Sequence, residues 1–128
     1  MTEAGAHDIE IRIKRVYSEP TAEDGTRVLV DRMWPQGLRK ERARLDCWDK
    51  ELGPSKALRK WFAHDPQRWR EFRHRYFSEL DSKPEAVHKL IEIAQQQRPV
   101  TLVYASRDVE HNNARALKDY LYERLQTH

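Results

Sequence analysis

The sequence predicts a small α/β domain built on an open, mostly parallel sheet of three to four strands, flanked by helices in a Rossmann-like three-layer arrangement. Two apolar runs, 27–32 and 100–105, are rich in β-forming residues and lack the alternation of half-exposed strands. Such runs are typical of central parallel strands covered on both faces. The 67 residues between them, from 33 to 99, contain amphipathic helical segments, which favours one elaborated right-handed crossover.

The composition fits one globular domain. The chain has 128 residues, of which 38% are hydrophobic and 35% charged, enough to bury one core. We expect residues 1–8 to be a flexible tail and 9–128 to form a single domain. The 24 basic and 21 acidic residues are mixed along the chain and leave a net charge of +3. This mixture is typical of a solvated surface, so nucleic acid is a less favoured partner than a small anion.

Cysteine usage and hydropathy indicate the compartment. Cys47 is the single cysteine, so no internal disulfide and no zinc knuckle are expected. The first ten residues contain acids and no apolar run, unlike a signal peptide. No stretch approaches the ~20 apolar residues of a membrane-spanning helix. We therefore expect a cytoplasmic protein with no membrane contact.

The elements around the first central strand are less regular. Isoleucines at 9, 11 and 13 alternate with charged residues, which predicts a half-buried strand over 9–16. The connector 18–26 contains Pro20 and an Asp24-Gly25 turn, and it leaves open whether strands 9–16 and 27–32 are parallel or form a hairpin. Residues 38–43 are interpreted as a short helix and 45–48 as a short edge strand.

Four helices are predicted further along the chain. Ser55 is a cap for a helix over 56–63, and Asp65-Pro66 is a strong start signal for a helix that ends near 81. Pro84 opens the third helix, which stops at Arg98-Pro99. The last is expected from 109 to 126, with its buried stripe at Ala114, Leu117, Leu121 and Leu125.

The predicted fold indicates where a ligand would bind. In open parallel sheets, ligands bind beyond the carboxyl ends of the strands, which here means the segments 31–37 and 106–112. In the second segment a strand passes through Ser106, Arg107 and Asp108 into a helix start, and free backbone N–H groups there favour an anion. Arg107 is predicted to clamp the anion and His111 to act as acid or base.

Several of these residues also have simpler interpretations. Asp108 suits an ordinary helix cap better than catalysis, and Arg107 would pair with it in that case. Asn112 is assigned to a ligand edge, together with Ser106. The segment has no glycine, so it is not a dinucleotide or P-loop motif, and no cofactor is predicted.

The first segment contributes Asp31, Arg32 and Trp34. Adjacent acidic and basic residues at a strand end point to opposite faces, and they are assigned to catalysis and to anion binding respectively. A structural ion pair with the crossover helices is the alternative for both. Trp34 would stack on a ligand or belong to the core, and His64 is placed near the site as a loop residue. The spacing of the histidines predicts no metal site.

The same residues carry a resemblance to a known family. The runs RIKRVY, DGTRVLVDRMWPQGL, KELGPSKALRKWFAHDPQRWREF and VTLVYASRDVEHNNA are similar to the YeaO-like family of bacterial proteins, a domain-of-unknown-function group. The similarity extends from about residue 11 to 125. It implies a compact cytoplasmic α/β protein with no established activity. Gln36 stands where the family pattern commonly has arginine, so a charge role at that position is not expected here.

The sequence is compatible with three functions, and it does not determine whether the chain is an enzyme. The leading hypothesis is binding, hydrolysis or group transfer of a small phosphate- or carboxylate-bearing molecule, held by Arg32 and Arg107 with Asp31 orienting His111. The second is a nucleic-acid-binding module. The third is a regulatory or assembly module without catalysis, in which the strand-end residues are structural. Oligomeric state is not predicted.

Overall fold

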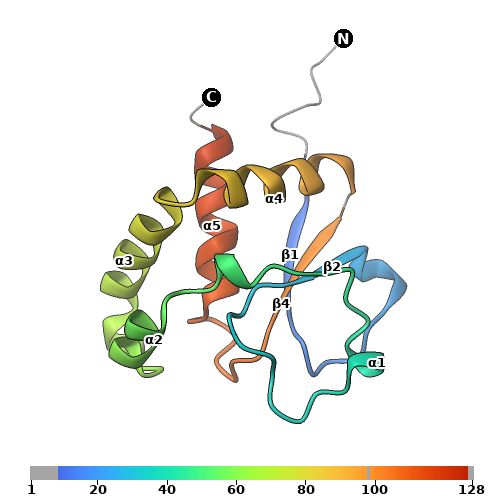
Figure 1. The fold of residues 1–128 in the computed structure, drawn as a ribbon, viewed down its shortest axis with the longest axis horizontal. Coiled ribbons are helices and arrows are strands. Elements are labelled where there is room, and N and C mark those ends of the chain that lie inside the picture. Colours follow the sequence, from blue (N-terminus) through green and yellow to red (C-terminus); the bar gives the residue numbers. More distant parts are fainter. Residues whose placement is uncertain (1–8, 98, 127–128) are drawn as a thin grey trace.

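The computed structural model describes residues 9–97 and 99–126, and it confirms the predicted fold class. Four parallel strands form one open sheet in the order β1-β4-β2-β3, with helices flanking it (Figure 1). The expected tail, residues 1–8, lies outside the described residues. No helix in the described part of the chain is long and apolar enough to cross a membrane.

The pairing of the strands resolves the question of a hairpin. β1 (Ile11–Arg15) and β2 (Thr26–Leu29) both pair with β4 (Val100–Tyr104) in parallel, one on each side of it. β3 (Cys47–Trp48) is a short edge strand beside β2, as predicted. Gly25, between the first two strands, has φ +66°, and a Cβ there would lie 2.2 Å from the Pro99 carbonyl oxygen. Only glycine suits this close approach.

Alternate residues of the central strands enter two different clusters, which explains their non-alternating apolar sequence. Val28 and Leu102 belong to the large core beneath the helices, whereas Leu29 and Val103 belong to a small cluster on the opposite face. That second face is covered by Trp34, Leu38 and Leu45 from the segment around the short helix α1 (Lys40–Ala43).

The larger core is built by the four longer helices. They are α2 (Lys56–Phe62), α3 (Trp69–Asp81), α4 (Pro84–Gln96) and α5 (Asn113–Gln126). The predicted cap at Ser55 is confirmed, since its Oγ accepts the Leu58 N–H at 3.1 Å. Short 3-10 turns occur at Ala22–Asp24, Lys50–Leu52 and Pro66–Arg68, the last of which precedes α3.

The start of the last helix was predicted wrongly. α5 begins at Asn113 and not at 109, because the Asp108 carboxylate accepts the N–H groups of Glu110 and His111 at 2.9 Å each and holds these residues in a bend. Asn112 caps the helix in its place, with Oδ1 accepting the Arg115 N–H at 2.9 Å. His111 therefore lies in the loop before the helix and not one turn inside it.

Candidate functional site

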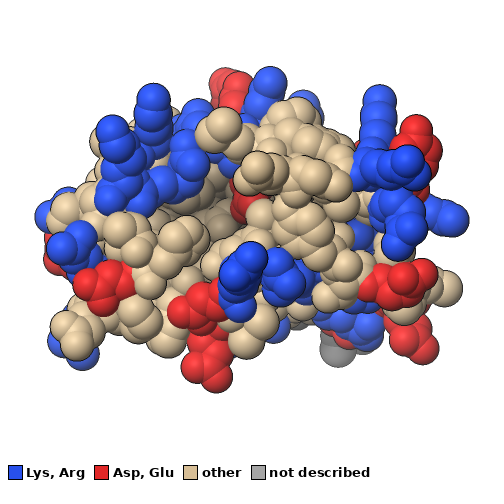
Figure 2. All heavy atoms as spheres, turned by 90° about the horizontal axis from the view of Figure 1, so that it is seen from below, with Lys and Arg blue, Asp and Glu red and all other residues tan. Residues whose placement is uncertain are grey.

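A cavity of about 920 Å³ lies at the carboxyl ends of the strands. Figure 2 shows this end as a hollow with Lys and Arg side chains along its rim. Two strand-end segments, 31–36 and 105–108, line it together with residues 111–113 before α5. The helical layer contributes Phe72 of α3 and six residues in and around α2, which are Pro54, Lys56, Arg59, Lys60, Phe62 and His64.

All nine residues assigned to the site from sequence line this one cavity. They are Asp31, Arg32, Trp34, His64, Ser106, Arg107, Asp108, His111 and Asn112. The two strand-end segments meet because β2 and β4 are neighbours in the sheet and end at the same edge. Their proximity follows from the topology, whereas a role in binding or catalysis stays a prediction.

Asp31 holds the two segments together from inside the cavity. Its Oδ2 accepts the Ala105 N–H at 3.0 Å, and its Oδ1 accepts the Asn113 side-chain amide at 3.1 Å. Burial raises the pKa of the Asp31 carboxyl, against the lowering effect of these two hydrogen bonds and of the positive charge on Arg59. The charge of Asp31 is thus compensated only in part by its surroundings.

The Arg32 side chain donates hydrogen bonds to two backbone carbonyls. Its Nε donates to the Pro54 carbonyl at 3.1 Å and its Nη2 to the Gly53 carbonyl at 3.0 Å. Gly53 approaches so closely that a Cβ on it would lie 2.6 Å from the Arg32 backbone nitrogen. Arg32 thereby fixes the segment that leads into α2. It lines the cavity, but these contacts occupy two of its three guanidinium nitrogens.

Trp34 is anchored as a wall of the cavity. Its indole N–H donates to the Leu38 carbonyl at 2.9 Å, and its ring meets Trp48 edge-on at a centroid distance of 5.4 Å. The ring also packs against the small apolar cluster on the second face of the sheet. Trp34 therefore belongs to this apolar cluster and also lines the cavity, whereas its stacking on a ligand stays a prediction.

The loop after β4 is organised around Asp108. Besides its two backbone contacts, its carboxylate lies 3.0 Å from His111 Nδ1, and its N–H donates to Ser106 Oγ at 3.1 Å. Burial tends to raise the pKa of Asp108, but the hydrogen bonds from Glu110 and His111 outweigh it and lower the pKa. Asn112 is 2% exposed and donates its amide to the Asp108 carbonyl at 2.9 Å.

The Asp108–His111 contact gives the imidazole a defined orientation. A carboxylate on Nδ1 favours the tautomer in which Nε2 is the free acceptor. Among the described residues, Nε2 of His111 makes no hydrogen bond. The Trp69 ring meets the imidazole edge-on at 5.3 Å. The pair has the form of an oriented acid–base group, and His111 also lines a second, smaller cavity of about 560 Å³.

Arg59 was missed from the sequence. It lines the cavity from α2, and its Nε is buried without a hydrogen-bond partner among the described residues. Lys56 and Lys60 lie on the same face of the helix, at spacings of three and four residues. This basic stripe, opposite Leu58 and Phe62, was a signal available in the sequence.

Arg107 and His64 lie at the rim. Both are exposed, and the side chain of Arg107 makes no hydrogen bond or ion pair with any described residue. His64 has φ +57°, directly after Ala63 at φ +48°, so the chain turns sharply where α2 ends. In the described part of the chain, no group of three or more His, Cys, Asp or Glu side chains is placed to hold a metal ion.

Comparisons with known proteins confirm the family resemblance. A family model described as "Inactive DUF488-N3 subclade" matches residues 10–128. The uncharacterized protein YeaO of Escherichia coli (strain K12) is 41% identical over 113 residues, which cover 88% of this chain and 97% of YeaO. The uncharacterized proteins Rv3073c of Mycobacterium tuberculosis (strain H37Rv) and Mb3100c of Mycobacterium bovis are each 40% identical over 114 residues, 89% of this chain and 95% of theirs. No solved structure matches the chain significantly. The chain therefore belongs to the DUF488 family.

Proposed function

We propose that the cavity at the carboxyl ends of the strands binds a small anionic molecule bearing a phosphate or carboxylate group, and that it does so without turnover. The position of the cavity is the usual one for a ligand in an open parallel sheet. The description of the matching subclade as inactive favours binding over catalysis.

The observation that carries this proposal is the Arg59 side chain, which lines the cavity and makes no hydrogen bond or ion pair with any described residue, its Nε being buried as well. A buried guanidinium N–H without an acceptor costs free energy, because it has lost its hydration and gained no partner. Arg59 interacts electrostatically with the Asp31 carboxylate but makes no hydrogen bond to it. The other two guanidinium nitrogens of Arg59 also make no hydrogen bond to any described residue, so an anion in the cavity would bind them.

The other charged residues around the cavity also favour an anion. Five Lys and Arg side chains line it and only two carboxylates, those of Asp31 and Asp108. Both carboxylates already accept hydrogen bonds from the protein. Arg107 and the α2 lysines are exposed at the rim, so they can turn towards a ligand with little loss of other contacts.

Calorimetric titration with inorganic phosphate and with ribose 5-phosphate at low ionic strength tests the proposal. We expect binding by the wild type and a loss of about tenfold or more in affinity in Arg59→Gln, as for the removal of one charge-assisted hydrogen bond. Arg42→Gln, an exposed arginine outside the cavity, is the matched control and should leave affinity unchanged. Equal affinity of Arg59→Gln and wild type would contradict the proposal.

The Asp108–His111 pair favours a second candidate, hydrolysis or group transfer at an ester of such an anion. An imidazole oriented through Nδ1 has the geometry of a general base. Incubation with phosphate and carboxylate esters, followed by NMR, would reveal turnover. Product that disappears in His111→Gln would support this candidate over simple binding, and an unchanged substrate would remove it.

A further inference from the structure

We propose that the ligand of this cavity also carries a flat heterocycle with N–H donors, of the kind found in a guanine nucleotide, and that Asp31 recognises it. The inference rests on the proposed anion site and specifies the rest of the molecule. It is drawn from the size of the cavity, from its apolar walls and from the free acceptor positions on Asp31.

The cavity is far too large for an anionic group alone. Its volume of about 920 Å³ lies in the upper part of the range that holds ligands of nucleotide or drug size, roughly 300–1,000 Å³. Phosphate or carboxylate would occupy only the part of the cavity beside Arg59 and the exposed cations. The remaining space requires a second, larger portion of ligand.

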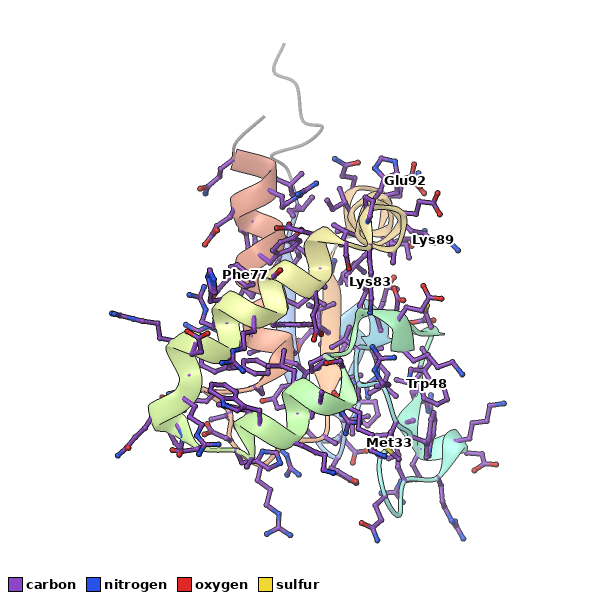
Figure 3. All side chains as sticks on the ribbon, turned by 60° about the vertical axis from the view of Figure 1, so that its left-hand side comes forward. Met33, Trp48, Phe77, Lys83, Lys89 and Glu92 are labelled. Atoms are coloured by element: carbon purple, nitrogen blue, oxygen red, sulfur yellow. The ribbon has the colours of Figure 1, made fainter. Side chains whose placement is uncertain are left out.

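The chemistry of the walls indicates an apolar, flat portion. Phe62 and Phe72 line the cavity from the helical side, and their rings stack at a centroid distance of 4.4 Å. On the opposite side lie Met33, Trp34 and Pro35. Met33 is 63% exposed and lies at the end of the molecule where the strands end (Figure 3). Because Phe62 and Phe72 are only 6% and 2% exposed, an aromatic ring would cover mainly the surface of Met33 and Trp34.

Asp31 gives the ring a polar point of recognition. Each of its oxygens accepts one hydrogen bond from the protein, and a carboxylate oxygen has room for two. The two oxygens together suit a pair of adjacent N–H donors, such as N1–H and the exocyclic amine of guanine. Adenine presents one amine beside a ring acceptor and suits a carboxylate less well. A buried acceptor that fixes orientation within apolar walls is the usual arrangement in small-molecule sites.

The exposed cations and the acid lie at different depths of the cavity. Lys56, Lys60 and Arg107 are exposed at the rim, whereas an acidic side chain is visible inside the hollow (Figure 2). Arg59 is less exposed, and its charge acts on the Asp31 carboxyl. Binding of the ring at Asp31 would leave the anionic group within the range of the α2 cations and Arg107. Ring and anion would then be held from opposite ends of one ligand.

The test compares GMP, AMP and ribose 5-phosphate by calorimetric titration of the wild type, Asp31→Asn and the control Glu41→Gln, an exposed acid outside the cavity. We expect the wild type to bind GMP at least tenfold more tightly than AMP or ribose 5-phosphate. Asp31→Asn should bind GMP about tenfold more weakly, and ribose 5-phosphate as tightly as the wild type or more so, because a negative charge near Arg59 is lost. These opposite changes distinguish recognition from misfolding.

The outcomes separate this inference from the proposal on which it rests. If ribose 5-phosphate binds through Arg59 but GMP binds no more tightly, the ring inference is overturned and the anion site stands. GMP affinity that is equal to that of AMP, or that is unchanged in Asp31→Asn, overturns the role of Asp31. If no anion binds the wild type, both fail.

Discussion

A buried ion pair ties the first crossover to the sheet. Arg27 is 3% exposed and Asp24 6%, with Arg27 Nη1 2.7 Å from Asp24 Oδ2. Lys14 lies 3.0 Å from the other carboxylate oxygen, and Arg27 Nη2 donates to the Ala43 carbonyl at 2.9 Å. Buried charges are tolerated only when their hydrogen-bonding capacity is used in this way. No local pattern in the sequence singles out this pair.

The pair makes stability depend on pH. Burial tends to raise the pKa of Asp24, but hydrogen bonds from Thr21, Lys14 and Arg27 outweigh it and lower the pKa to about 2. Because the folded value lies below the unfolded one, the stabilisation is complete above about pH 4 and is lost as the pH falls through 2. The loss amounts to about 2 kcal/mol of unfolding free energy.

Asp24→Asn tests this dependence by urea unfolding at pH 7, 4 and 2.5. The variant leaves Arg27 buried and unpaired, so we expect a loss of about 3–5 kcal/mol at neutral pH. The difference from the wild type should shrink below pH 4, because the unfolded wild type takes up a proton at Asp24 there while the folded state stays ionised until the pH approaches 2. Glu41→Gln is the exposed control. A difference that stays constant from pH 7 to 2.5 would contradict this account.

The surroundings of Asp31 differ from those of the structural carboxylate Asp24. Asp24 has a guanidinium in direct contact and a lowered pKa, whereas Asp31 has two uncharged donors and a raised pKa. The negative charge of Asp31 therefore costs folding free energy, because burial raises the pKa of the carboxyl more than its partners lower it. Such a cost, in a residue that lines a cavity, is typical of functional sites.

At the level of elements, α2 is a short helix with two distinct faces. Leu58 and Phe62 bury one face in the core, while Lys56, Arg59 and Lys60 occupy the face towards the cavity. Seven residues form too short a helix to be stable alone, so its ends must be fixed. Ser55 does this at the start, since its N–H and hydroxyl both donate to the carboxylate of Glu79 on α3.

The start of α5 depends on Asn112. This side chain caps the helix through Oδ1 and steadies the Asp108 loop through its amide, and it is almost fully buried. We expect Asn112→Ala to lower the unfolding free energy by about 1–3 kcal/mol, because the cap is lost and the partly buried Asp108 carbonyl loses its donor. Chemical denaturation measures the change.

The control for this prediction is Glu123→Ala, an exposed position on the same helix. It should change stability by no more than about 0.5 kcal/mol. A loss in Asn112→Ala as small as that of the control would mean that the residue is not the cap on which the helix depends.

For the molecule as a whole, the features that could be predicted from sequence were the regular ones, namely the central strands and the edge of the sheet where they end. The apolar runs at 27–32 and 100–105 predicted the central strands because both faces of each are covered. The rule for open sheets then predicted the place of the cavity and eight of the nine assigned residues that line it, all except His64. These inferences needed only local pattern and the direction of the strands.

The missed features depend on contacts between distant segments. Arg32 was expected to clamp an anion, but it donates to carbonyls 21 and 22 positions away, which no local pattern reveals. Arg59 was overlooked because a basic residue on a helix is usually solvated, and only the fold brings it over the buried Asp31. The bend at 108–112 arises from one carboxylate competing with helix formation.

The segment between β3 and α2 connects the sheet to the helical layer, and Arg32 is one of several residues that hold it in place. Its guanidinium holds Gly53 and Pro54, while the Tyr76 hydroxyl on α3 donates to the Leu52 carbonyl. The cations of α2 follow directly. The position of the cationic rim relative to the sheet thus depends on this connection.

Arg32 and Arg107 should consequently respond differently to the same substitution. Arg32→Ala removes two hydrogen bonds to buried carbonyls, and we expect it to lower the unfolding free energy by about 1–3 kcal/mol. Arg107→Ala removes an exposed side chain without partners among the described residues, so stability should change by no more than about 0.5 kcal/mol while affinity for ribose 5-phosphate falls. Chemical denaturation and calorimetry on both variants separate the effects. If Arg107→Ala instead loses stability and keeps its affinity, the strand-end arginines are structural, and the chain is better explained as a regulatory or assembly module.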